Sequence, residues 1–214
     1  MRDRGAGLGP PGFSGKMRSV LRLLALLLAS SLALACAGPS ASAAAPTSGG
    51  AAAFFPLAVG NQWIYVDESP ALPPAQRGTR RTVRILERGA DGYFRDNERG
   101  ELRADADCVH DRLRRLLCGP ITRGNSWSSV VSVGSTERYE IAGVGETVET
   151  PAGRFQGCVR VRAHNRVNAG TDTVLEISYA PGVGPVRIET WAVVEDKAAP
   201  QVRAVLQSYR IEGR

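Results

Sequence analysis

Residues that could carry chemistry are few, since the chain of 214 residues holds four cysteines and two histidines. His110 and His164 lie far apart, and the sequence contains neither His-x-x-x-His nor Cys-x-x-Cys, so it lacks the close ligand spacing of a zinc site. The nearest match to the nucleophile motif Gly-x-Ser-x-Gly is GNSWS at 124–128, which lacks the final glycine. We therefore expect no metal, no cofactor and no enzymatic activity. A hydrolase whose site is assembled from residues distant in sequence is the alternative.

Cys36 is the residue best placed for a covalent modification. It follows an uncharged apolar run, Leu23–Ala35, which is shorter than the roughly 20 residues of a membrane-spanning helix. Arg18 and Arg22 precede that run, as in a cleaved signal peptide. The junction Ala33-Leu34-Ala35-Cys36 resembles the signals of bacterial lipoproteins, although its first position is alanine where leucine is usual. The resemblance implies that Cys36 is lipidated, and an ordinary cleaved signal is the alternative.

These signals divide the chain into four parts. Residues 1–16 are a disordered leader or an incorrectly assigned start, because Met17 stands directly before the basic residues. Residues 17–35 form the signal-peptide helix, and residues 36–53 are the lipidated cysteine and a disordered tether without charge or large apolar residues. Residues 54–214 are left as one domain. The lipid would hold this domain in the cell envelope, and Ala37, in place of aspartate, favours the outer membrane.

The net charge of +6 belongs largely to the segment before Cys36. That segment has five basic residues and one acidic residue, which leaves 22 basic and 20 acidic residues and a net charge of +2 for the exported part. A protein this close to neutrality lacks the charge expected of a nucleic-acid binder. We therefore expect no nucleic acid as a partner. The membrane is the expected partner, through the lipid on Cys36.

The domain has the period-two pattern and frequent turn signals of an antiparallel β-protein. In one strand Val159 and Val161 alternate with Arg160 and Arg162, so one face of the sheet is apolar and the other is wet. The sequence predicts an all-β fold, a curved antiparallel meander that forms a half-barrel or an incomplete barrel without a helix to fill it. The predicted strands are 62–67, 80–88, 92–97, 100–105, 113–118, 136–142, 145–149, 155–167, 172–179, 185–195 and 201–211.

Two short stretches, GNQW at 60–63 and GNSW at 124–127, repeat a Gly-Asn-x-Trp pattern and predict two equivalent strand starts. Glycines at 143, 145, 182 and 184 precede no predicted helix, so we interpret both Gly-Val-Gly stretches as turns and not as phosphate loops.

Four motifs in order carry a further resemblance: FFPLAVGNQWIY at 54–65, CGPITRGNSW at 118–127, ETPAGRFQGCVRV at 149–161 and YAPGVGPVRIE at 179–189. Together they resemble the TapB-like domains, an uncharacterised family of bacterial exported β-proteins. Their half-barrel is similar to that of lipoprotein-localisation carriers. The resemblance implies a fold and an exported setting, and it implies no reaction.

Three cysteines, Cys108, Cys118 and Cys158, would enter an oxidising compartment after export, where one bridge can form. Cys108 and Cys118 flank one predicted hairpin, so we favour a disulfide between them, with Cys158 as a packed free thiol.

The curved sheet would leave a concave apolar face without a helix to cover it. We therefore expect a binding or structural module, in which that face binds an acyl chain or a protein partner in a groove lined by Trp63, Tyr179 and Trp191. If the sheet closes on itself instead, these three aromatic residues belong to the core.

Overall fold

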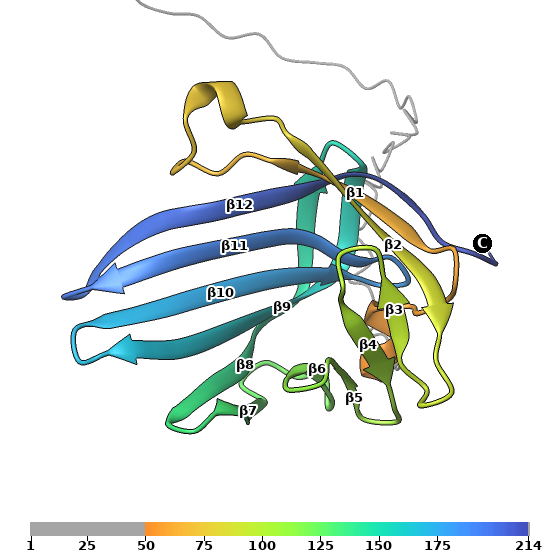
Figure 1. Cartoon of the computed structure of the whole chain (residues 1–214), viewed down its shortest axis with the longest axis horizontal. Helices are drawn as coiled ribbons and strands as arrows, with labels where there is room; N and C mark the ends of the chain where they lie inside the picture. Colours follow the sequence, from red (N-terminus) through yellow and green to blue (C-terminus); the bar gives the residue numbers. More distant parts are fainter. Residues whose placement is uncertain (1–49, 214) are drawn as a thin grey trace, which may run out of the picture. The chain divides into compact units, whose positions relative to one another are not determined.

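The computed structural model describes residues 50–213, which form one antiparallel β-sheet of twelve strands and two short 3-10 helices (Figure 1). The helices are η1 (Ala51–Phe54) and η2 (Pro74–Gln76). The strands are β1 (Gln62–Asp67), β2 (Arg80–Arg88), β3 (Phe94–Asp96), β4 (Glu101–Ala104), β5 (Cys108–His110), β6 (Arg115–Cys118), β7 (Ser126–Ser132), β8 (Ser135–Thr150), β9 (Gly153–Asn168), β10 (Thr171–Ala180), β11 (Gly184–Val194) and β12 (Lys197–Arg210).

The sheet consists of two six-stranded meanders, β1 to β6 and β7 to β12, joined where β1 pairs with β12. The order of strands ends at β6 on one side and at β7 on the other. Figure 1 shows the long strands β9–β12 side by side, with the shorter strands β3–β6 beyond β2. The sheet curls until its two ends approach each other, which confirms the predicted all-β, curved antiparallel meander.

The sequence prediction missed two strands, β5 and β7, and it divided β8 into two strands, 136–142 and 145–149. β5 has three residues, too few for a period-two pattern, and β7 is rich in serine. β8 runs without a break through 143–145, where the register shifts and Gly145 has a φ of +74°. The glycines there form β-bulges, so the predicted turn at 143–145 is wrong. Gly182 does lie in a turn, between β10 and β11.

The ordered domain begins before the predicted boundary at residue 54. Ala51 and Phe54 of η1 are buried, and the N–H of Gly182 donates a hydrogen bond to the carbonyl of Ala53 at 2.7 Å. Residues 51–53 therefore belong to the domain, although three alanines give no apolar pattern. The predicted signal peptide, Cys36 and most of the tether lie outside the described residues.

Aromatic side chains fill one end of the curled sheet. The Phe55 ring packs against those of Trp63 and Tyr179, with centroids 5.6 Å and 6.0 Å apart, respectively. The Trp63 indole Nε1 donates to the carbonyl of Val183 at 2.7 Å, so its polar atom is satisfied in the core. Among the described residues, the core cluster extends from 51 to 211. This segment carries its own hydrophobic core, as a domain does.

The two Gly-Asn-x-Trp stretches, 60–63 and 124–127, start β1 and β7 in the same way, as the sequence predicts. Each glycine has a positive φ, 96° and 87°, and donates its N–H to an isoleucine carbonyl at 2.9 Å and 2.8 Å. Each asparagine side chain donates to the carbonyl of a proline five residues earlier, at 2.9 Å in both. The acceptors are Ile85, Ile141, Pro56 and Pro120.

Candidate functional site

The long strands present two chemically different faces. Val161, Ile177 and Ile188 are neighbours across β9, β10 and β11, and all three belong to the core or pack against it. We call their side of the sheet the inner face. Arg162 and Glu176 are neighbours on the opposite side, the outer face.

A cavity of about 300 Å³ lies on the inner face, at the low end of the volumes of small-molecule sites. Among the lining residues, Leu175 of β10 lies between two others, because it pairs with Ala163 of β9 on one side and with Thr190 of β11 on the other. These residues continue the inner face from the filled core towards the hairpin tips. The lining residues of this inner cavity are Arg114, Glu137, Ala163, Asn165, Thr173, Leu175 and Thr190.

An ion pair stands at one side of the inner cavity. Arg114, in the turn between β5 and β6, donates from Nε to Glu137 Oε2 of β8 at 2.9 Å. The Tyr139 hydroxyl donates to the same carboxylate. Pairing with Glu137 raises the pKa of Arg114. Burial, followed by the hydrogen bond to Glu137, raises the pKa of Tyr139. The Glu137 side chain is 12% exposed and that of Arg114 is 38% exposed, so Arg114 is the outer member of the pair.

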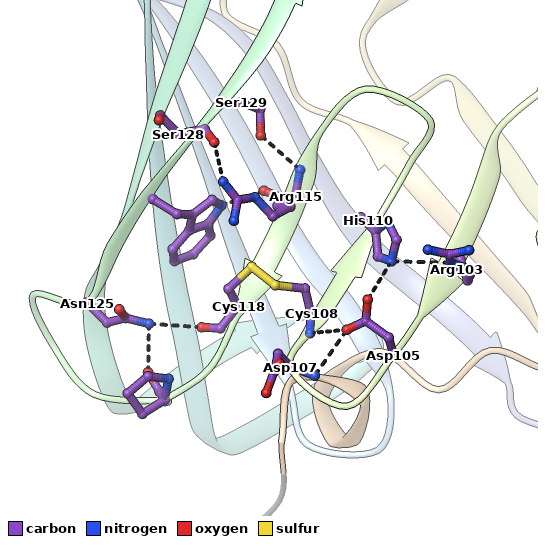
Figure 2. Close-up of a disulfide and its surroundings, with 12 residues drawn as sticks. Arg103, Asp105, Asp107, Cys108, His110, Arg115, Cys118, Asn125, Ser128 and Ser129 are labelled. Carbon is purple, nitrogen blue, oxygen red and sulfur yellow. Dashed lines mark hydrogen bonds and ion pairs between the residues drawn. A yellow bond between two sulfur atoms is a disulfide. The ribbon is translucent and has the colours of Figure 1, made fainter.

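Side chains connect the two ends of the sheet, and we call this junction of β6 and β7 the seam (Figure 2). The Arg115 backbone N–H donates to Ser129 Oγ at 3.0 Å, and Arg115 Nη2 donates to the carbonyl of Ser128 at 2.7 Å. The Trp127 indole donates in return to the Arg115 carbonyl at 2.6 Å. Each of these hydrogen bonds uses at least one side chain, in contrast to the backbone ladders elsewhere in the sheet.

A disulfide joins Cys108 to Cys118 beside the seam, and it is the pairing that the sequence favours (Figure 2). The two cysteines are directly opposite each other in β5 and β6. The carboxylate of Asp105 accepts the N–H of Cys108 at 2.7 Å, a hydrogen bond that lowers the pKa of Asp105. Asp105 also contacts His110 Nε2 at 3.0 Å. Strands β5 and β6 are thus held together covalently as well as by their ladder.

Cys158 is the free cysteine among the described residues, and it is buried. The sequence places Cys158 and Val159 on opposite faces, yet neither is exposed. Gly157 has a φ of +71°, and the β8–β9 register shifts nearby. Burial raises the pKa of the Cys158 thiol to about 11, so it is protonated at neutral pH.

The structure does not bring the three predicted groove residues together, and this part of the prediction is wrong. Trp63 and Tyr179 are each 1% exposed and belong to the core. Trp191 is a neighbour of Val174 on the outer face, in a shallow depression that His164 also lines. Closure of the sheet at one end is what buries the first two, because Phe55 and the turn at 181–183 pack against them.

The inner cavity residues were missed, although a signal for them exists in the sequence. Leu175 and Ile177 have the same period-two phase as Tyr179 in β10. Arg114 and Glu137 carry no such signal, since they come from a turn and from another strand.

The histidines and the serine motif do not form a catalytic arrangement within residues 50–213. His110 pairs with Asp105, His164 is exposed, and Ser126 is simply the first residue of β7. Among the described residues no hydrogen bond joins a histidine to a hydroxyl or a thiol, and no group of three or more His, Cys, Asp or Glu could hold a metal ion. The described segment also has no helix that is long and apolar enough to cross a membrane.

The arginine-rich outer face is an ion-pair network. Arg160 contacts Glu146 and Glu176, each at 3.0 Å. Arg162 contacts the same Glu176 at 2.7 Å and Glu140 at 3.2 Å. These arginines are therefore paired with carboxylates of the same sheet.

Comparison with known proteins assigns no family, because no family model and no curated protein matches the chain. Two solved structures are similar. One is a protein of Bacteroides fragilis provisionally named an exported protein with a YmcC-like fold, with 15% identity and a TM-score of 0.39, covering 74% of this chain and 99% of that one. The other, from Parabacteroides distasonis, is provisionally named a lipoprotein, with 16% identity and a TM-score of 0.33, covering 73% and 98%. Similarity this low transfers no function, and membership of the TapB-like domains stays a prediction.

Proposed function

We propose that this chain is an exported, lipid-anchored protein of the cell envelope whose β-domain binds an apolar chain in the inner cavity. The observation that carries the binding proposal is the position of that cavity on the core-bearing face of the sheet. At one end of the sheet this face is filled by aromatic side chains, and at the other it is hollow.

The walls of the cavity suit an apolar ligand. Ala163 and Leu175 supply aliphatic surface, and Thr173 and Thr190 add methyl groups. Removing this surface from water would contribute about 25 cal/mol for each Å² that a ligand covers. The charged atoms of the lining belong to Arg114 and Glu137, which already satisfy each other. A ligand with a long apolar part therefore fits better than a strongly charged one.

A fluorescence titration tests this proposal. The chain from Ala37 onward, which lacks the lipidated cysteine, is titrated with N-phenyl-1-naphthylamine, an uncharged apolar fluorophore. We expect saturable binding, displaced by fatty acids. Leu175→Trp fills the cavity and should abolish binding, whereas Val174→Trp places the same side chain on the outer face and should leave binding intact. Equal behaviour of the two variants, or no titration by the original chain, would refute binding at this site.

The anchoring part of the proposal is supported by the Ala33-Leu34-Ala35-Cys36 junction. Mass spectrometry of the mature N-terminus should find an acylated Cys36, and Cys36→Ala should release the protein from membranes. More than one acyl chain is needed for stable attachment. Fractionation of inner and outer membranes then tests the expected outer-membrane location. A mature N-terminus elsewhere, or an unmodified cysteine, contradicts this part alone.

A further inference from the structure

We propose that the seam between β6 and β7 is a gate through which an apolar ligand reaches the inner cavity, with the Arg114–Glu137 ion pair as its latch. This inference rests on the proposed function, because it assigns the route to the site described above. It also predicts a motion of the protein without ligand, which can be measured independently.

The seam is a place where the sheet can part without breaking a backbone ladder. Between neighbouring strands such as β9 and β10, separation would break a continuous backbone ladder from Asp172 to Tyr179. At the seam, parting breaks the three hydrogen bonds that join Arg115 to Ser128, Ser129 and Trp127. It also breaks the one that the Asn125 side chain donates to the Cys118 carbonyl at 3.2 Å. Water can replace the partners of these groups, so breaking each hydrogen bond costs much less than the full strength of the bond.

Strands β4 to β6, residues 101–118, form the flap that would move. β3 pairs with β4 through two residue pairs, so the flap is joined to the rest of the sheet by a short ladder. The disulfide between Cys108 and Cys118 keeps β5 and β6 together during such a motion. A short ladder lowers the cost of local opening, whereas Val109 and Leu117, both fully buried in the core, oppose it.

Arg114 occupies the position that a latch requires. It lines the inner cavity and also a depression of about 220 Å³ that includes Arg112 and Leu113, so it stands between the inside and the outside of the sheet. Its partner Glu137 is the cross-strand neighbour of Ser129. Consecutive flap residues, Arg114 and Arg115, therefore hold adjacent residues of β7 and β8. When the flap moves, the latch and the seam must open together.

A covalent lock tests the gate. Arg115→Cys with Ser129→Cys would bridge the seam in the chain from Ala37 onward, with the native disulfide retained. The control lock, Ile64→Cys with Ser208→Cys, joins β1 to β12, which are paired by a backbone ladder. We expect the seam lock to slow association and release of N-phenyl-1-naphthylamine at least about tenfold, as closure of a required path does. The control lock should leave both rates unchanged.

A second variant addresses the latch without a bridge. Glu137→Gln keeps the shape of the side chain and removes the charge, so the closed state loses an ion pair. The association and release rates should both rise, by up to about fivefold for a partly exposed pair. Glu140→Gln removes a carboxylate that pairs with Arg162 on the outer face and serves as the control.

Hydrogen exchange of the protein without ligand separates failure of the gate from failure of the proposed function. The amides of Val109 and Leu117 should exchange together, faster than those of β9–β11, and the seam lock should slow them selectively. If the original chain binds no probe but its flap exchanges in this way, the binding proposal fails and the motion stands. The gate proposal is refuted if the backbone amides of all strands exchange together. It is also refuted if the protein with the seam lock binds N-phenyl-1-naphthylamine at the original rate.

Discussion

Replacing both Cys108 and Cys118 with alanine removes the covalent closure of a short loop and should lower the free energy of unfolding by about 3 kcal/mol. The two residues are separated by 10 positions in the chain. In the chain-entropy description, a crosslink that closes a loop of this length removes about 9 cal/mol/K from the entropy of the unfolded ensemble, hence about 3 kcal/mol at 25 °C. For a domain of this size, 1 kcal/mol corresponds to about 2–4 °C, so we expect the Tm to fall by roughly 9 °C.

Differential scanning calorimetry of the chain from Ala37 onward measures this effect. The double variant should melt at the same temperature with and without reductant, and reduced original protein should melt near the variant. Cys158→Ala is the matched control, since it removes the other described cysteine and keeps the bridge, so its Tm must still fall on reduction. A double variant as stable as the oxidised protein would refute the loop-closure reasoning.

Three further predictions concern the core and the strand starts. Cys158 should react with thiol reagents only after unfolding. Because burial raises the pKa of its thiol from 9 to about 11, the stability that the protonated thiol contributes is complete below pH 9 and is lost as the pH rises through 11. Denaturation at increasing pH measures this loss. Trp63→Phe leaves the Val183 carbonyl without its indole donor and should cost about 1–3 kcal/mol in urea unfolding. Asn61→Ala should destabilise more than Asn125→Ala in the same assay, because Asn61 is fully buried and also accepts the N–H of residue 212.

The cysteine pairing and the two strand starts were accessible from sequence for the same physical reason. Cys108 and Cys118 are close along the chain, so a single hairpin brings them together. The Gly-Asn-x-Trp stretches use positive φ at glycine and a side-chain hydrogen bond to a residue five positions earlier, and both are local. Interactions that depend on neighbours in sequence leave a pattern that can be identified without a structure.

The aromatic residues illustrate where that reasoning fails. Period-two alternation places Tyr179 on one face of its strand, but it does not tell whether that face is open or covered. Trp63 comes from β1, and Tyr179 is more than a hundred residues away, yet Phe55 packs against both. Bulges add a second difficulty, because one extra residue reverses the phase of all later positions in the strand.

By itself, the sequence determined the all-β class, the succession of long strands, the favoured cysteine pair and the low net charge of residues 36–214, since each follows from composition or local periodicity. Tertiary structure alone decided that one end of the sheet is filled and the other is hollow, that Arg114 meets Glu137 at the cavity, and that β6 approaches β7 through side chains. These features depend on how far the sheet curls. That curvature is the sum of twist and bulges over twelve strands, and no short stretch of sequence encodes it.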